Sequence, residues 1–176
     1  KLDYKKDIFK IIPNGYYVNQ SSNFNPALKD YNGVLRICLI ARWHPQKDFE
    51  NLFQALDLLN YKNIDYHLTI AGNRTGKKNK ELISLINKYD LNDKCTLLGE
   101  VENVDKIYSQ SHITILPSSH GEAFPNVLVE SMINFTPCIS TDVGDSAHII
   151  SNTGLVVPVR DYKSLADAIV KNLIII

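Results

Sequence analysis

Residues 34–60 read VLRICLIARWHPQKDFENLFQALDLLN, and this stretch decides the fold. It begins with a nearly continuous apolar run at 34–41, passes through a polar turn, and ends in a segment where Leu52, Leu56 and Leu59 share a face at helical spacing. The run predicts a strand and the segment predicts a helix. A strand that is apolar on both faces is typical of a parallel sheet that helices cover on both sides.

The same alternation continues to the end of the chain. Strands are predicted at 34–41, 66–71, 95–98, 112–116, 137–140 and 154–157, and helices at 48–60, 78–89, 103–110, 125–134, 145–151 and 162–173. This order predicts an α/β fold with a doubly wound, Rossmann-like parallel sheet. Residues 1–33 are polar and rich in turn residues, which predicts an interdomain linker or domain edge before a single domain at 34–176. Ligands in such folds bind beyond the carboxyl ends of the strands.

Composition excludes several classes of function. Nineteen basic and nineteen acidic residues cancel, so no long-range field favours nucleic acid as a partner. Cys38, Cys95 and Cys138 lie far apart in apolar runs, which fits reduced, buried thiols better than a zinc site or a catalytic thiol. No apolar run approaches the roughly 18 residues of a membrane span, and the polar start is unlike a signal peptide. We expect a cytoplasmic protein. If the full-length form attaches to the membrane, we expect it to lie peripherally at the inner face.

Arg42 and Lys47 follow the first predicted strand and precede a helix whose expected N-cap is Asp48. An arginine grips a diphosphate bidentately and a lysine adds a mobile point charge, so this pair suits a phosphate site. Two solvated surface cations are the alternative.

Residues 116–130, LPSSHGEAFPNVLVE, again run from a strand through a turn into a helix. Pro125 is expected in the first helical turn, where free amide groups form an anion site. Glu130 lies two turns along an otherwise apolar helix and needs a partner, for which the hydroxyl pair of a ribose is suitable. The alternatives are a salt bridge or an exposed face for Glu130, and a solvated loop carboxylate for Glu122.

Gly72 and Gly99 each follow a predicted strand, where they allow either a sharp turn or close approach by a ligand. Neither belongs to a G-x-G-x-x-G fingerprint, so a dinucleotide-dependent reductase loses its main support. The five histidines show no metal-ligand spacing, and His120 is the one nearest the expected site.

Together these segments resemble the carboxyl-terminal, donor-binding domain of the group 1 glycosyltransferases, often called family four, which have two Rossmann domains in the GT-B arrangement. The resemblance covers nearly the whole chain. Its motifs are Ile12-Pro13-Asn14-Gly15, Ala41-Arg42 with Lys47-Asp48, Ala71-Gly72, Leu98-Gly99, Pro117-Ser118, the E-x7-E motif from Glu122 to Glu130, and residues 153–158.

The resemblance implies a role for each matching residue. Arg42 and Lys47 would stabilise the departing diphosphate, Glu122 would hold the transferred sugar, and Glu130 would hold the nucleotide ribose. Fixed cations lower such a barrier without a metal ion, so neither a metal nor another cofactor is expected. The implied donor-binding residues are Arg42, Lys47, Gly99, Val101, Glu122, Ala123, Phe124, Pro125, Asn126, Val127 and Glu130.

The resemblance also implies partners. The substrate would be a nucleotide diphosphate sugar, and a glycan or lipid-linked acceptor would bind through an amino-terminal domain that this chain lacks. The sequence around Gly144 and His148 is similar to a subset of the family associated with surface polysaccharide assembly. We therefore expect half of a retaining glycosyltransferase, with weak nucleotide binding and no transfer by this part alone. The alternatives are a GT-B epimerase or phosphorylase, or a non-catalytic nucleotide-binding module.

Overall fold

The computed structural model describes residues 14–16 and 31–173, and its centre is a parallel sheet in the order β3-β2-β1-β4-β5-β6. The strands are β1 (Leu35–Ile40), β2 (Tyr66–Ala71), β3 (Cys95–Gly99), β4 (Ile113–Leu116), β5 (Cys138–Thr141) and β6 (Leu155–Val157). The α-helices are α1 (Phe49–Tyr61), α2 (Lys80–Lys88), α3 (Asp105–Gln110), α4 (Asn126–Ile133), α5 (Ser146–Ile150) and α6 (Tyr162–Leu173). Short 3₁₀ helices, Pro45–Lys47 and Asn92–Lys94, precede α1 and β3.

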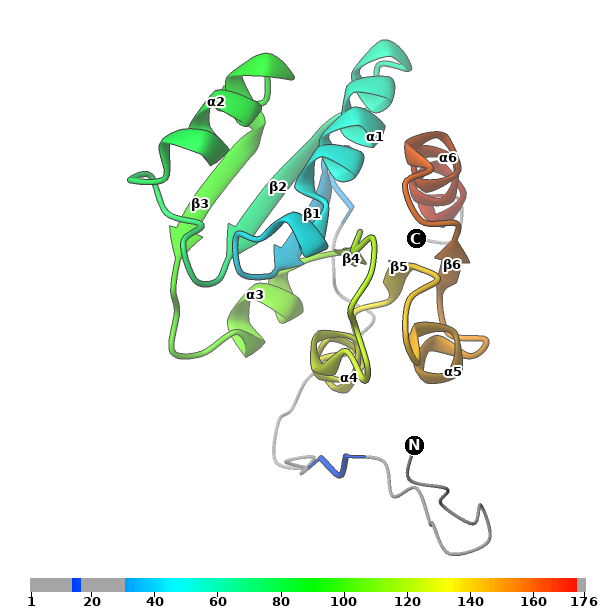
Figure 1. Ribbon diagram of the computed structural model, residues 1–176. Helices are drawn as coiled ribbons and strands as arrows, with labels where there is room; N and C mark the ends of the chain where they lie inside the picture. The colour runs from blue at the N-terminus through cyan, green and yellow to red at the C-terminus, as the bar shows by residue number, and fades with distance from the viewer. Residues whose placement is uncertain (1–13, 17–30, 174–176) are drawn as a thin grey trace, which may run out of the picture.

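Helices cover both faces of the sheet. Figure 1 shows α1, α2 and α6 on one face and α3, α4 and α5 on the other. The first face holds the larger core, in which Leu52, Leu56 and Leu59 of α1 are fully buried against the sheet. The second face holds two smaller clusters, one around Tyr108 and one around Leu128. The predicted two-sided burial of the sheet is therefore confirmed.

The chain reverses its direction of travel across the sheet beside β1. From β1 it moves outward through β2 to β3, and it then returns to place β4 on the opposite side of β1. The loops that follow β1 and β4 leave the sheet in opposite directions at this point, so a crevice opens between them. In doubly wound folds this switch point is where ligands bind.

The predicted elements agree with the structure to within about two residues. Asp48 is the N-cap of α1, as expected, and its side chain accepts a hydrogen bond from the backbone N–H of Asn51. Two details differ. Pro125 occupies the N-cap position of α4 and precedes the first helical turn, because its ψ of 98° is extended and not helical. The strand β3 is half exposed because it forms one edge of the sheet.

Most of the predicted linker, residues 1–13 and 17–30, lies outside the described residues. The domain boundary placed at residue 33 therefore stays a prediction.

Candidate functional site

A cavity of about 460 Å³ lies at the switch point between β1 and β4. The loop after β1 contributes Arg42 and Lys47, and the loop after β4 contributes Glu122. Its other lining residues are Ile40, Ala41, Gln46, Gly72, Gly121 and Val127. Two cations and one carboxylate that are up to 80 positions apart in the sequence thus meet in one cavity, at the edge of the sheet where the sequence placed them.

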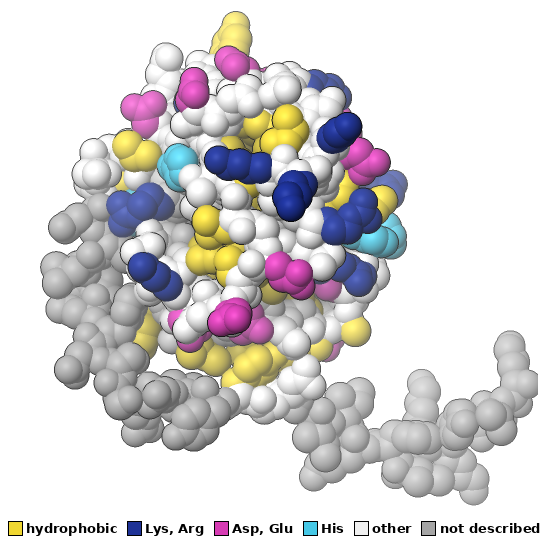
Figure 2. Space-filling model, turned by 90° about the vertical axis from the view of Figure 1, so that its left-hand side faces the viewer, with side chains coloured by type: hydrophobic (Ala, Val, Ile, Leu, Met, Phe, Trp, Pro, Cys, Tyr) yellow, Lys and Arg dark blue, Asp and Glu magenta, His cyan; other side chains and the backbone are white. Residues whose placement is uncertain are grey.

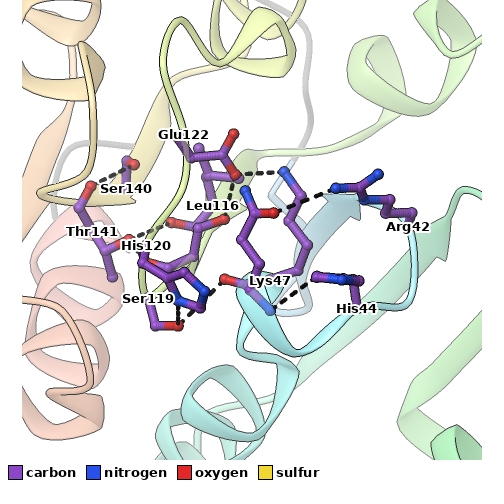
Figure 3. A network of polar contacts seen from close by, with 11 residues as sticks. Arg42, His44, Lys47, Leu116, Ser119, His120, Glu122, Ser140 and Thr141 are labelled. Atoms are coloured by element: carbon purple, nitrogen blue, oxygen red, sulfur yellow. Dashed lines mark hydrogen bonds and ion pairs between the residues drawn. The ribbon is translucent and has the colours of Figure 1, made fainter.

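The carboxylate of Glu122 is the centre of a polar network in this cavity (Figure 3). The Nζ atom of Lys47 lies 2.5 Å from Oε1 of Glu122, and the hydroxyl of Ser118 donates to the same oxygen at 2.7 Å. The side chains of Lys47 and Glu122 are only 14% and 10% exposed. Glu122 is therefore a partnered, largely buried carboxylate, which removes the solvated-loop alternative.

Arg42 is more exposed than Lys47 and has a weaker partner. Its Nη2 atom donates to the side-chain oxygen of Gln46 at 3.4 Å. The guanidinium lies beside the cavity without a carboxylate to neutralise it among the described residues. An anion that enters the cavity would meet one arginine with its charge available and one lysine already shared with Glu122.

Neighbouring strands fix the backbone around Glu122. Thr141, at the end of β5, donates its hydroxyl to the carbonyl of Ser118 at 2.5 Å. The backbone N–H of Asp145 donates to the carbonyl of Ala123 at 2.8 Å. Gly144 has a φ of +52°, and a Cβ atom there would overlap the carbonyl oxygens of Glu122 and Ala123. The loop after β5 thus fits tightly against the loop that carries Glu122.

The beginning of α4 borders the same site. The side chain of Pro125 offers no acceptor to the first amides of the helix, and the N–H of Leu128 donates to the carbonyl of Pro125. The N–H groups of Asn126 and Val127 have no partner among the described residues and remain available to an anion. Asn126 accepts hydrogen bonds from the side chains of Asn14 and Tyr16, and the ring of Phe124 stacks on the ring of Tyr16 with centroids 6.4 Å apart. The predicted linker motif therefore contacts the predicted donor-binding loop.

Glu130, on the second turn of α4, has a tyrosine as its partner. The hydroxyl of Tyr108, from α3, donates to Oε2 of Glu130 at 3.1 Å. Burial raises the pKa of the Tyr108 hydroxyl, and the nearby charge of Glu130 raises it further, so this group keeps its proton and remains a donor. No lysine or arginine among residues 14–16 and 31–173 forms a salt bridge with Glu130, so that alternative is wrong for the described part of the chain.

Four of the eleven predicted donor-binding residues line the 460 Å³ cavity, and the other seven do not: Gly99, Val101, Ala123, Phe124, Pro125, Asn126 and Glu130. Gly99 borders a separate hollow together with Glu100 and the basic segment 74–80. Figure 2 shows Lys and Arg side chains gathered on this face of the molecule. Val101 packs on the cluster around Tyr108. The structure thus places Gly99 and Val101 near the cavity of Arg42 but not among its lining residues.

The structure also shows why residue 72 is a glycine and where His120 lies relative to the cavity. The φ of Gly72 is +135°, and a Cβ atom there would overlap the carbonyl oxygen of Ala41, so glycine is required by backbone packing. His120 is exposed and does not line the cavity. Its Nδ1 atom and the Ser119 hydroxyl share a hydrogen bond of 2.9 Å.

Sequence reasoning missed four residues that shape the site: Ser118, Thr141, Gly144 and Tyr108. Ser118 lay within a quoted motif, Pro117-Ser118, but nothing in its neighbours showed which side chain its hydroxyl would meet. Thr141 and Tyr108 act through contacts between segments that are distant in the sequence.

The three cysteines form no disulfide, with Cys38 and Cys138 buried and Cys95 partly buried, as expected. Within the described ranges there is no group of three His, Cys, Asp or Glu side chains placed to hold a metal ion. Nor does any helix there have the length and apolar character needed to cross a membrane.

A family profile described as glycosyl transferases group 1 matches residues 22–174. The chain belongs to this family. Among characterised proteins, this group 1 member is 35% identical over 136 residues to the exopolysaccharide phosphotransferase SCO2592 of Streptomyces coelicolor, a match that covers 76% of the chain and 14% of that protein.

Solved structures show the same fold. A glycosyltransferase from Rickettsia africae superposes with a TM-score of 0.74 at 24% identity, over 86% of this chain and 44% of that one. Anabaena Alr3699/HepE in complex with UDP-glucose superposes with a TM-score of 0.71 at 20% identity, over 82% of this chain and 40% of that one. These likenesses confirm the predicted Rossmann-like half of a GT-B fold. The chain spans less than half the length of each of these three proteins.

Proposed function

We propose that this chain is the donor-binding half of a retaining glycosyltransferase that uses a nucleotide diphosphate sugar. One observation carries the proposal: Arg42, Lys47 and Glu122 line one cavity at the switch point of the sheet. Two cations suit a diphosphate, and a carboxylate with one unoccupied oxygen suits a sugar hydroxyl. The complex of Alr3699/HepE with UDP-glucose, a protein of the same fold, supports this choice of ligand.

The chemistry follows from the charges. When the bond between the anomeric carbon and the diphosphate breaks, negative charge accumulates on the departing diphosphate. Arg42, Lys47 and the first amides of α4 stabilise that charge because they are positioned before the reaction begins. Glu122 orients the sugar. Fixed donors of this kind make a metal ion unnecessary, and metal independence is part of the proposal.

The nucleoside is proposed to extend from this cavity toward Glu130, which would accept from the ribose hydroxyls, and toward Gly99 and Val101. The acceptor, a glycan or a lipid-linked glycan, would bind through an amino-terminal domain of the same polypeptide. The exopolysaccharide relative supports a place in the synthesis of surface polysaccharides. The first experiment names the nucleotide.

Calorimetric titration with UDP, GDP and ADP, with and without EDTA, tests the proposal. We expect one diphosphate to bind in both conditions, and the Arg42→Ala/Lys47→Ala variant to weaken that binding by at least tenfold. The variant Lys163→Ala/Lys171→Ala is the matched control, because it removes two exposed cations of α6 that line neither the cavity nor the hollow beside Gly99. Equal losses in both double variants would contradict the assignment of the diphosphate to Arg42 and Lys47.

A further inference from the structure

We propose that Ser118 is the positioning residue for the sugar-binding carboxylate of Glu122, and this proposal rests on the proposed function. The hydroxyl of Ser118 fixes one carboxylate oxygen so that the other is presented to the sugar. Ser118 contacts neither the cavity nor the expected ligand directly, and it would act only through Glu122.

The two oxygens of Glu122 differ in their surroundings. Oε1 receives hydrogen bonds from both Ser118 and Lys47, whereas no described residue donates to Oε2. In Figure 3 one oxygen of Glu122 carries the dashed lines and the other carries none. Because Glu122 also lines the cavity, Oε2 is the acceptor that is left for a hydroxyl group of a ligand.

The two donors to Oε1 differ in rigidity. Lys47 holds its ammonium group on a flexible four-carbon stem, and it is also a cation that an incoming diphosphate attracts. Ser118 has a short side chain, is fully buried, and has its own carbonyl oxygen held by Thr141. When Lys47 turns toward the diphosphate, Ser118 is the donor that keeps Oε1 in place. A functional group is held in its productive geometry by such a locked neighbour.

Glu130 shows the same arrangement. One of its oxygens, Oε2, accepts from the buried hydroxyl of Tyr108, and no donor to Oε1 occurs in the part of the chain that the structure describes. Each glutamate of the E-x7-E motif thus has one oxygen anchored by a buried hydroxyl and one open. The repetition on two different elements supports a positioning role for the hydroxyl of Ser118.

The test compares each nucleoside diphosphate with its sugar conjugate, because only the sugar reaches Glu122 in the proposal. The probes are UDP with UDP-glucose, GDP with GDP-mannose, and ADP with ADP-glucose, titrated calorimetrically into the chain and its variants. We expect Ser118→Ala to bind the diphosphate within twofold of the wild-type affinity and to bind the sugar conjugate about tenfold more weakly.

Ser119→Ala is the matched control. It removes a hydroxyl from the next residue, which contacts His120 and the carbonyl of Gln46 and does not contact Glu122. Both affinities should stay at the wild-type level in this variant. If Ser118→Ala does not fold, Ser118→Cys keeps nearly the same shape with a much weaker donor, and it should show the same selective loss.

The possible failures give different results. Unchanged binding of the sugar conjugate by Ser118→Ala would overturn the positioning role and leave the proposed function intact. Equal weakening of the diphosphate and its conjugate would also overturn it, because a merely structural serine affects both. A wild-type chain that binds none of the six probes would overturn the proposed function, and the positioning role with it.

Discussion

Lys47 and Glu122 form a 2.5 Å ion pair across the crevice between the loops that follow β1 and β4. Both side chains are largely withdrawn from water, so removal of the lysine would leave a carboxylate charge nearly buried. Such an unpaired charge is costly. We predict that Lys47→Met lowers the free energy of unfolding by about 2–3 kcal/mol, as measured by urea denaturation.

Lys62→Met is the control for this prediction. Lys62 forms a 3.2 Å ion pair with Asp167, but these two side chains are 47% and 75% exposed. Exposed pairs contribute little, so this variant should lie within about 0.5 kcal/mol of wild type. The double variant Lys47→Met/Glu122→Gln should regain part of the loss, since it removes the stranded charge. Equal losses of unfolding free energy in Lys47→Met and Lys62→Met would show that the Lys47–Glu122 pair stabilises the fold no more than an exposed ion pair does.

Tyr108 and Glu130 give a second prediction. The Tyr108 side chain is fully buried and its hydroxyl donates to a carboxylate, so Tyr108→Phe removes a charge-assisted hydrogen bond with little change in packing. We predict a loss of about 1–2 kcal/mol in the free energy of unfolding. Affinity for the nucleoside diphosphate should also fall several-fold in calorimetry, because Glu130 loses its anchor.

Tyr89→Phe serves as the comparison. The Tyr89 hydroxyl also donates to a carboxylate, that of Glu50, but Glu50 has Lys88 as a second donor and lies away from the cavity. Its loss should lower stability less and leave nucleotide affinity unchanged. If Tyr108→Phe binds nucleotide as wild type does, the hydroxyl is not needed to orient Glu130.

The sequence was sufficient for the order of elements and for the edge of the sheet where the site lies. Apolar runs such as residues 34–41 predict buried parallel strands directly. Arg42 and Lys47 are predicted as site residues because they come after one of these strands. The partners of these residues could not be predicted in the same way. The pairing of Lys47 with Glu122 depends on the β1–β4 adjacency, which arises only when the chain crosses back over the sheet.

Gly144 shows the same limit. In the sequence it belongs to a segment that resembles a subset of the family, and no role for the glycine itself follows from that. Its requirement for glycine comes from the carbonyl oxygens of Glu122 and Ala123, which lie more than 20 residues earlier in the chain. Close backbone contacts between loops leave no local pattern in composition or periodicity, so only the folded structure identifies them.

This contact leads to a third prediction. Gly144→Ala must place a Cβ atom where those carbonyl oxygens lie, in addition to the strain of a left-handed backbone. We predict a loss of about 3 kcal/mol in unfolding free energy and weaker binding of sugar nucleotides, since the loop with Glu122 has to move. Gly33→Ala is the control, because Gly33 also has a positive φ, +93°, but no atom lies within 4 Å of its added Cβ. That variant should lose about 1 kcal/mol and bind ligand normally, and similar losses in the two variants would contradict the role of the carbonyl contact.

The last prediction concerns alkaline pH. Burial raises the pKa of the Cys95 thiol and of the Cys138 thiol to about 12, well above the value of about 8.5 for a thiol in an unfolded chain. Between these two values the folded protein keeps both protons while the unfolded chain releases them. Ionisation therefore favours the unfolded state, and the contribution of these thiols to stability is complete below about pH 8.5 and falls as the pH rises toward 12.

Urea denaturation at pH 7.5, 9 and 10.5 measures this effect. We expect the free energy of unfolding to decline over that range, and to decline less steeply in Cys95→Ser/Cys138→Ser, because serine does not ionise there. A thiol reagent such as Ellman's reagent should also react slowly with the folded wild-type protein at pH 8 and rapidly after urea is added. If the pH slope of the double variant equals that of wild type, or if all thiols react at once in the folded protein, the two cysteines are not held as neutral, buried groups.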